Sequence, residues 1–163
     1  MRGHRQADQL FYTASALADH SVLWHSIGAM RAMSGSRGRR EALRLAGALG
    51  FESFFVNVGV KSRFKRTRPV AQGIRPFGLR TPLTSSFPSG HASSAFLAAT
   101  LLTDGAPALA PAWYGLATVV AVSRVHVNIH HPSDVVAGAA LGVALGLVIR
   151  KIVPLVPPPD PAK

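Results

Sequence analysis

The 163-residue sequence contains no cysteine and few acidic or aromatic residues. Without cysteine the chain can form no disulfide and perform no thiol chemistry, and the sulfur ligands of structural zinc sites are missing. Only 7 aspartates and glutamates accompany 18 lysines and arginines, which gives a formal net charge of +11. Aromatic residues make up 7% of the chain, so we do not expect a surface on which nucleic-acid bases stack. The positive charge therefore needs another partner.

Long apolar segments indicate that this partner is a membrane. Mean hydropathy is +0.24, and only 15% of the residues are charged. A basic chain with such segments fits an anionic membrane surface and an anionic substrate. Residues 1–6 are not followed by an apolar core with a small-residue cleavage site, so we expect no removable signal peptide. The length fits a single domain, residues 1–163, without internal repeats.

Apolar periodicity predicts an all-α fold, a transmembrane bundle of about four to six helices with its active site at one membrane interface. Residues 9–33 have helical spacing and form either an interfacial amphipathic helix or an imperfect first span. Residues 34–40 are predicted to be a solvent-facing turn. The remaining segments are helices at 41–60, 92–103, 113–122 and 135–149, with a flexible proline-rich tail at 154–163.

Two features of these segments leave alternatives open. Some apolar runs, such as residues 92–103, are shorter than a full span, so a compact soluble helical bundle is the competing fold. Glycine and alanine are frequent in residues 135–149. Such small residues allow helices to pack closely in lipid, and they also permit a homo-oligomer.

Three polar segments interrupt the apolar pattern, and the first is strongly basic. Lys61 and Arg68 are seven residues apart within residues 61–86. They either converge on one phosphate group or belong to a loop that binds anionic lipid. In the second segment Ser89 and Gly90 begin an apolar helix, whose free N–H groups suit an oxyanion, and His91 lies on the first turn beside them.

The third polar segment contains Arg124, His130 and Asp134. Arg124 offers a planar set of donors for phosphate oxygens. If a helix begins after Pro132, Asp134 can approach one nitrogen of His130 and leave the other facing a substrate. By itself this segment is equally compatible with a structural histidine.

Several other polar residues are interpreted as structural. His20 and His25 are assigned to helix positions near the headgroup boundary, and Glu52 and Asn57 to contacts between helices. His126 and His131 are placed outside the catalytic set, and no metal site is expected.

The order of the helices predicts that all three polar segments meet at one membrane edge. The helix that ends near residue 60 delivers Lys61 and Arg68 to that edge, and the helix starting at His91 leaves it. The next helix returns there with Arg124, and the last one departs after Asp134.

At this spacing the three segments resemble the signature of the type 2 phosphatidic acid phosphatase superfamily. The matching residues are Lys61, Arg68-Pro69, Pro88-Ser89-Gly90-His91, Ser123-Arg124, His130 and Asp134. That superfamily includes lipid phosphate phosphatases and vanadium-dependent haloperoxidases. The chain is shorter than members with six spans.

The resemblance implies a role for each matching residue. His130 is the nucleophile that forms a phosphohistidine, Asp134 orients it, and His91 protonates the leaving group and then helps to activate water. The phosphoryl oxygens are bound by the remaining residues of the signature, which are Lys61, Arg68, Ser89, Gly90 and Arg124. No metal or other cofactor is required, since cations and a helix N-terminus supply the positive field.

Size and composition also resemble the compact actinobacterial members of this superfamily. This implies a polyprenyl-linked substrate such as decaprenylphosphoryl-5-phosphoribose, used in synthesis of cell-wall arabinan precursors. Alternatives are a polyprenyl diphosphate, phosphatidic acid or phosphatidylglycerophosphate. Other classes are a vanadate-dependent haloperoxidase and a non-catalytic lipid-binding protein. The expected location is the bacterial plasma membrane, where the positive-inside rule favours an extracytoplasmic active site.

Overall fold

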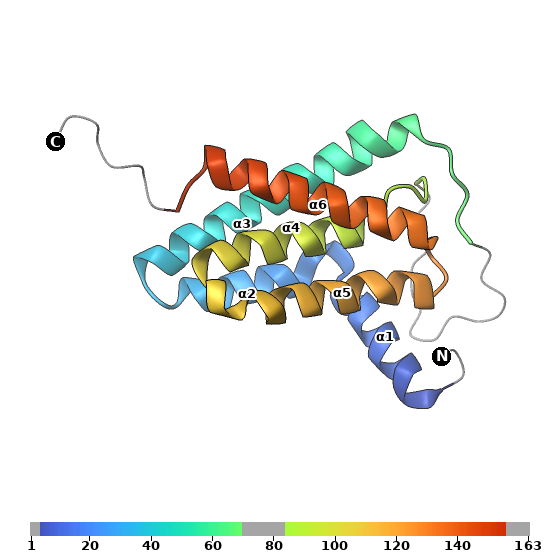
Figure 1. Ribbon diagram of the computed structural model, residues 1–163, viewed down its shortest axis with the longest axis horizontal. Helices are drawn as coiled ribbons and strands as arrows, with labels where there is room; N and C mark the ends of the chain where they lie inside the picture. Colours follow the sequence, from blue (N-terminus) through green and yellow to red (C-terminus); the bar gives the residue numbers. More distant parts are fainter. Residues whose placement is uncertain (1–3, 70–83, 156–163) are drawn as a thin grey trace.

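The computed structural model describes residues 4–69 and 84–155, and all regular structure in these ranges is helical. Helices α2 to α6 lie side by side along the long axis, whereas α1 extends away from the bundle (Figure 1). In chain order the α-helices are α1 (Arg5–Leu17), α2 (Val22–Ala32), α3 (Ser36–Phe54), α4 (Gly90–Gly105), α5 (Ala110–His126) and α6 (Pro132–Ile152). The described part of the chain confirms the predicted all-α bundle. The predicted tail at 154–163 falls largely outside the described residues.

Three helical stretches are long and apolar enough to cross a membrane: Ser36–Arg63, Pro107–His126 and Pro132–Ile152. The first of them is α3 continued by a π-helical segment, Phe55–Val60, and a 3-10 turn, Lys61–Arg63. Large apolar side chains are exposed along these stretches, as expected for helices that face lipid. Examples are Leu43, Phe51, Phe54, Val136, Leu147, Val148 and Ile152.

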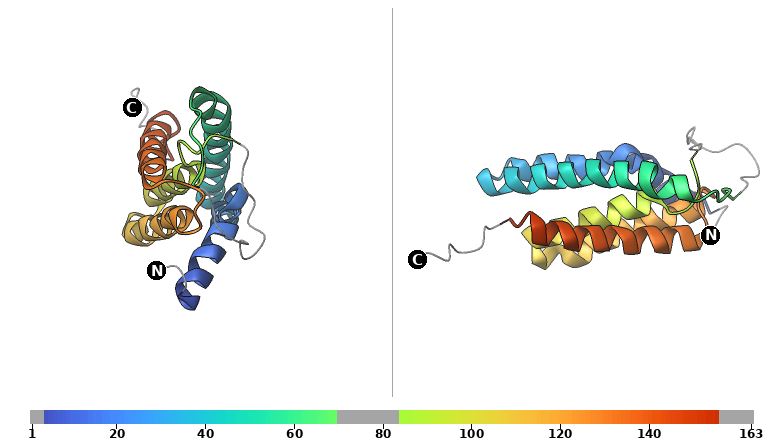
Figure 2. Two further views of the ribbon diagram at one scale, coloured as in Figure 1. Left: turned by 90° about the vertical axis from the view of Figure 1, so that its right-hand side faces the viewer. Right: turned by 90° about the horizontal axis from the view of Figure 1, so that it is seen from above.

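Helix α4 is the centre of the bundle. It packs against α3, α5 and α6, and the end-on view in Figure 2 shows it between these three helices. Leu97 of α4 belongs to a core cluster that also contains Trp24 of α2 and Leu45 of α3. This burial explains why the apolar run 92–103 is shorter than a full span, since α4 is covered by protein along most of its length.

Glycines of α6 allow it to approach α4 closely. A methyl group added at Gly138 would collide with the carbonyl oxygen of Ser89, and one at Gly142 with that of Ser93. At Gly146 an added carbon would lie 2.7 Å from Thr100 Cβ. The small residues of the 135–149 segment therefore hold the start of α6 against the start of α4.

The N-terminal third differs from its sequence-based prediction in two ways. The expected helix over residues 9–33 is broken between α1 and α2, where His20 and Ser21 adopt left-handed backbone conformations with φ of 52° and 58°. This bend turns the chain toward the N-terminal end of α4.

The predicted turn at residues 34–40 is the second difference, because α3 already begins at Ser36. Gly35, with φ of 99°, reverses the chain. Glu41 of α3 then holds α3 against α2, since Arg31 of α2 donates a hydrogen bond to it at 2.7 Å. Within α3, Arg37 also pairs with Glu41 at 3.3 Å. Charge pairing with the buried Glu41 thus extends the helix into a segment whose glycines and arginines resemble a loop.

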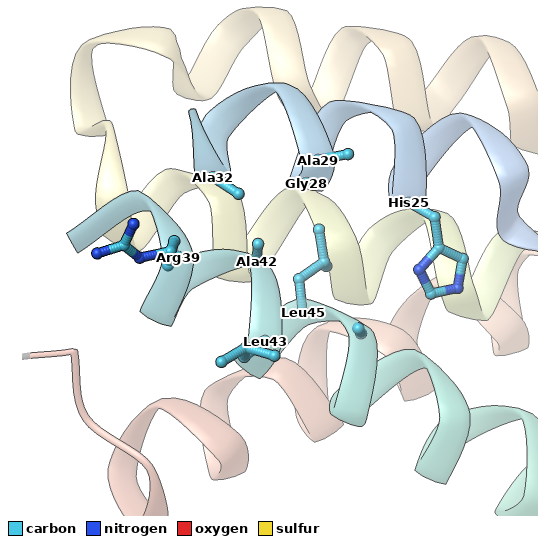
Figure 3. Close-up of a pocket in the computed structure, with 9 residues that line it drawn as sticks. His25, Gly28, Ala29, Ala32, Arg39, Ala42, Leu43 and Leu45 are labelled. Carbon is cyan, nitrogen blue, oxygen red and sulfur yellow. The ribbon is translucent and has the colours of Figure 1, made fainter. Parts of the chain in front are cut away.

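An apolar cavity of about 350 Å³ lies between α2 and α3. Figure 3 shows His25 near one end and Arg39 near the other, with small residues such as Gly28, Ala29 and Ala42 between them. None of the residues expected to act in catalysis lines this cavity.

The packing of α6 on α4 generates the first prediction. Gly142→Ala should lower the free energy of unfolding by roughly 1–3 kcal/mol, because the added methyl forces the two helices apart. Thermal unfolding in detergent, followed by tryptophan fluorescence, measures the change. Gly115→Ala is the matched control, since an added methyl there meets no atom within 4 Å. It should leave the melting temperature unchanged or raise it, and equal losses in the two variants would contradict the packing argument.

Candidate active site

All three polar segments of the sequence meet at one end of the bundle. The end of the α3 stretch, the start of α4, the end of α5 and the start of α6 lie together there (Figure 1). Hydrogen bonds join these segments across the chain. Arg68 contacts His130, and the backbone N–H of Ser89 donates to the carbonyl oxygen of Asp134 at 2.9 Å.

A cavity of about 390 Å³ opens among these segments. Its wall contains three of the residues expected to bind phosphate, together with both histidines expected to act in catalysis. The lining residues include Lys61, Arg68, Gly90, His91 and His130, together with Asp19, Glu52, Ser53, Asn57 and Ser94. Ser89, Arg124 and Asp134 lie behind this wall and are almost fully buried.

His130 presents its Nε2 atom to Arg68. The guanidinium Nη1 of Arg68 lies 3.2 Å from Nε2 and also donates to the carbonyl oxygen of Ile129 at 3.1 Å. Because arginine can only donate, Nε2 must accept and carry the lone pair. The proton of the neutral ring is then on Nδ1.

The surroundings of His130 keep its ring uncharged. Burial, followed by the positive charges of Arg68, Arg124 and Lys61, lowers the pKa of His130 to about 2. A neutral imidazole with a free lone pair is the form that can attack phosphorus. Its Nδ1 lies 3.6 Å from Asp134 Oδ2, which is an electrostatic approach rather than a hydrogen bond.

Asp134 is fully buried, and its carboxylate joins three other segments. Arg66 donates to Oδ1 at 2.8 Å, while Oδ2 accepts from the hydroxyl of Ser86 and, at 2.9 Å, from the backbone N–H of His131. Asp134 approaches the ring of His130, four residues before it, because Pro132 starts α6, as the sequence predicted. The carboxylate therefore fixes the loop that carries His130 as well as facing its ring.

The loop between α5 and α6 is folded tightly onto the end of α5. Asn128 has a left-handed backbone with φ of 59°, a conformation that asparagine tolerates better than most residues. The backbone N–H groups of Ile129 and His130 then both donate to the carbonyl oxygen of Arg124 at 3.1 Å. These bonds fix His130 relative to α5.

Lys61 and Gly90 face each other across the phosphate end of the cavity. An ideal Cβ on Gly90 would lie 3.6 Å from Lys61 Nζ, so the ammonium group lies close to the first residue of α4. Ser89 is the N-cap of this helix, and its hydroxyl accepts from the N–H of Ala92 at 3.4 Å. An anion beside Gly90 would meet both the helix N-terminus and Lys61.

His91 pairs with Asp19, a residue that the sequence pattern did not single out. Their Nε2 and Oδ1 atoms are 2.7 Å apart. Although burial raises the pKa of the Asp19 carboxyl, the hydrogen bond to His91 and the charges of His91 and Arg124 together hold it below its ordinary value. Asp19 is therefore ionised at neutral pH.

Arg124 supports this arrangement from within the protein. Its side chain is 1% exposed and donates to the hydroxyl of Ser15, with Asp19 Oδ1 at 3.9 Å. It contributes positive potential to the cavity, although it is absent from the lining. The N-terminal segment of the chain thus completes the surroundings of both His91 and Arg124.

The two remaining histidines of the third segment bind elsewhere. His126 pairs with Asp8 of α1 at 2.7 Å and lies against the ring of Phe11. His131 Nε2 lies 3.2 Å from the carbonyl oxygen of Thr67. Within residues 4–69 and 84–155, no group of three or more His, Asp or Glu side chains is placed to hold a metal ion.

Sequence reasoning missed Asp19, Arg66 and Ser86 at this site. Asp19 reaches His91 only because of the bend between α1 and α2, and Arg66 was indistinguishable from its basic neighbours. Asp19 lies about seventy residues before His91, and a separation of that length forms no recognisable sequence motif. Part of the basic segment, residues 70–83, falls outside the described residues.

Comparison with known proteins gives the same family as the signature. Residues 41–156 match the PAP2 superfamily. The chain is 36% identical to decaprenylphosphoryl-5-phosphoribose phosphatase of Mycobacterium tuberculosis over 85% of this chain and 76% of that protein.

Solved structures share the fold. The crystal structure of LpxE from Aquifex aeolicus superposes with a TM-score of 0.74 at 26% identity, covering 92% of this chain and 88% of that one. A transmembrane PAP2-type phosphatidylglycerolphosphate phosphatase from Bacillus subtilis has a TM-score of 0.52 at 21% identity, covering 93% of this chain and 87% of that one. With three stretches able to span a bilayer, the chain is an integral membrane protein and belongs to the PAP2 superfamily.

Proposed function

We propose that this protein is a phosphatase that hydrolyses the phosphomonoester of a membrane lipid through a phosphohistidine. The observation that carries the proposal is the lone pair of His130 Nε2, held beside Arg68 in a cavity that also contains Lys61 and His91. The nucleophile, the cations and a second histidine come from three segments far apart in sequence. The named activity of the mycobacterial relative supports the same reaction class.

In the first step Nε2 of His130 attacks phosphorus in line. The P–N bond forms as the ester P–O bond breaks, and His91 gives its proton to the leaving alkoxide. Arg68 donates to the attacking lone pair in the structure, so a bound phosphate has to displace that hydrogen bond. The same donors, with Lys61 and the N-terminus of α4, then stabilise the charge on the phosphoryl oxygens.

In the second step a water molecule attacks the phosphohistidine. His91, now neutral, accepts a proton from the water, and the P–N bond breaks to release inorganic phosphate and neutral His130. Asp134 at 3.6 Å favours the transient positive charge on His130. Asp19 does the same for protonated His91, which it contacts directly.

The proposed substrate is a polyprenyl-linked sugar phosphate of the decaprenylphosphoryl-5-phosphoribose type. Its support is the 36% identity to the mycobacterial phosphatase over most of both chains. The cavity lies where α3 ends and α4 begins, at one end of the candidate spans, so a phosphate can enter while its lipid chain stays in the bilayer. Phosphatidic acid, phosphatidylglycerophosphate and a polyprenyl diphosphate are the competing substrates.

A panel of these four lipid phosphates tests the substrate assignment. Purified protein in detergent should release phosphate fastest from the decaprenyl-linked ribose 5-phosphate. Phosphate release at equal lipid mole fraction is the measurement. A clear preference for phosphatidic acid or for a polyprenyl diphosphate would overturn the substrate, and no release from any of the four would overturn the phosphatase.

Replacing the two site histidines tests the mechanism. His130→Ala should abolish turnover, because no other group can form the covalent intermediate, and His91→Ala should lower kcat by about 10²–10⁴-fold. Phosphate release by protein of unchanged melting temperature is the readout. His126→Gln is the control, since His126 pairs with Asp8 away from the cavity, and it should stay active. Substantial turnover by His130→Ala would remove the nucleophile from the mechanism.

The pair formed by Asp19 and His91 predicts a change in pH dependence. Burial and the charge of Arg124 lower the pKa of His91 to about 4, and the hydrogen bond and charge of Asp19 oppose that shift, so Asp19→Asn should lower this pKa further. The alkaline limb of kcat/KM should then move down by about one to three pH units. Asp8→Asn, which removes the equivalent partner of His126, should leave the profile in place. An unshifted alkaline limb in Asp19→Asn would show that this carboxylate does not act through His91.

A further inference from the structure

Glu52 of α3 is a buried carboxylate on the wall of the active-site cavity that the phosphatase mechanism does not use. It is 2% exposed and lines the cavity together with Lys61 and His91. Its Oε1 atom has no hydrogen-bond partner in the part of the chain that the structure describes. Such a group inside a membrane-spanning stretch is costly unless it faces a polar ligand or water.

Glu52 lines the same cavity as Lys61 without pairing with it directly. It precedes Lys61 by nine residues on one continuous helical stretch, which corresponds to roughly 13–14 Å along the helix axis. No ion pair within 4.0 Å joins Glu52 to a cation among the described residues. The cavity therefore extends from the phosphate end to the last turn of α3.

Other polar groups line the same part of the wall. Ser53 follows Glu52 on α3 and Asn57 lies in the π-helical segment after it, and both line the cavity. The amide nitrogen of Asn57 donates to the carbonyl oxygen of Ser53 at 2.8 Å and contacts its hydroxyl at 3.3 Å. This internal bonding occupies the donors of Asn57 and leaves its amide oxygen as an acceptor.

The chemistry of these groups selects the part of a substrate that fits beside them. An ionised carboxylate can only accept hydrogen bonds, and so can a phosphate dianion, so in this form Glu52 cannot bind the phosphoryl group. Acyl and prenyl chains have no donor to offer. A hydroxyl group is a donor, and its hydrogen bond to a buried carboxylate is among the stronger ones in proteins.

We propose that Glu52, with Ser53 and Asn57, forms a hydroxyl-binding subsite that recognises a polyhydroxylated, sugar-like unit next to the phosphomonoester. The inference rests on the proposed phosphatase function and assigns the feature that sets its substrate class. Glu52 acts on specificity, while the bond-breaking steps belong to His130 and His91.

Two soluble phosphomonoesters with the same alkyl chain test the subsite. These are octyl ribofuranoside 5-phosphate and its 2,3-dideoxy analogue, which lacks the ring hydroxyls. The wild-type protein in detergent should prefer the hydroxylated ester by about tenfold or more in kcat/KM, the size expected for losing a hydrogen bond to a charged group. Glu52→Gln should lower kcat/KM for the hydroxylated ester several-fold more than for the dideoxy ester. The control Asp8→Asn removes a carboxylate outside the cavity and should keep the wild-type preference.

The possible results distinguish a failure of the hydroxyl-binding subsite from a failure of the phosphatase function. Equal rates on both esters with the wild-type protein would overturn the subsite and leave the phosphatase intact. Equal losses on both esters in Glu52→Gln would also overturn it, because the carboxylate would then serve only as a counter-charge for Lys61. No turnover of either ester or of any lipid phosphate would overturn the phosphatase itself. If Glu52→Gln does not fold, the preference of Asn57→Ala decides, and an unchanged ratio there rejects the subsite.

Discussion

The buried carboxylate of Asp134 is the interaction on which the rest of the active-site end depends. It binds Arg66 from the segment after α3, Ser86 from the segment before α4 and the backbone of the loop that holds His130. The backbone carbonyl oxygen of Asp134 accepts a hydrogen bond from the N–H of Ser89 at the start of α4. Removing one partner of such a buried pair costs about 3–5 kcal/mol. Through its side chain and its backbone carbonyl, Asp134 thus links all three polar segments of the sequence, and its carboxylate faces the nucleophile.

The bundle brings Asp134 to this position through the close contact of α6 with α4. Gly138 and Gly142 let the first turns of α6 lie directly on the backbone of α4. With α4 buried at the centre, its N-terminus faces inward toward Lys61, and the loop before α6 lies beside it. The catalytic geometry therefore depends on helix packing, because any separation of α6 from α4 would also separate His130 from the phosphate end of the cavity.

The N-terminal segment gives the site a second set of acidic partners. Asp19 contacts His91 and lies near Arg124, so a concentration of positive charge is balanced on the side of the proton donor. Glu52 adds another acidic group to the wall of the same cavity. The cavity therefore has a cationic end suited to phosphate and an acceptor-rich wall suited to hydroxyl donors, inside helices that otherwise face lipid.

The sequence by itself determined the family, the all-α architecture and the convergence of the three polar segments. These depend on helical periodicity and on fixed spacings within single segments, such as the four residues between His130 and Asp134. The tertiary structure decided which side chains from distant parts of the sequence pair with one another. Asp19 meets His91 across seventy-two positions, Arg66 rather than its basic neighbours binds Asp134, and α3 begins five residues before its predicted start because Glu41 pairs with Arg31 and Arg37. Such partners are chosen by where helices bend and pack, since charges buried in a bundle pair with whichever group the packing brings within reach.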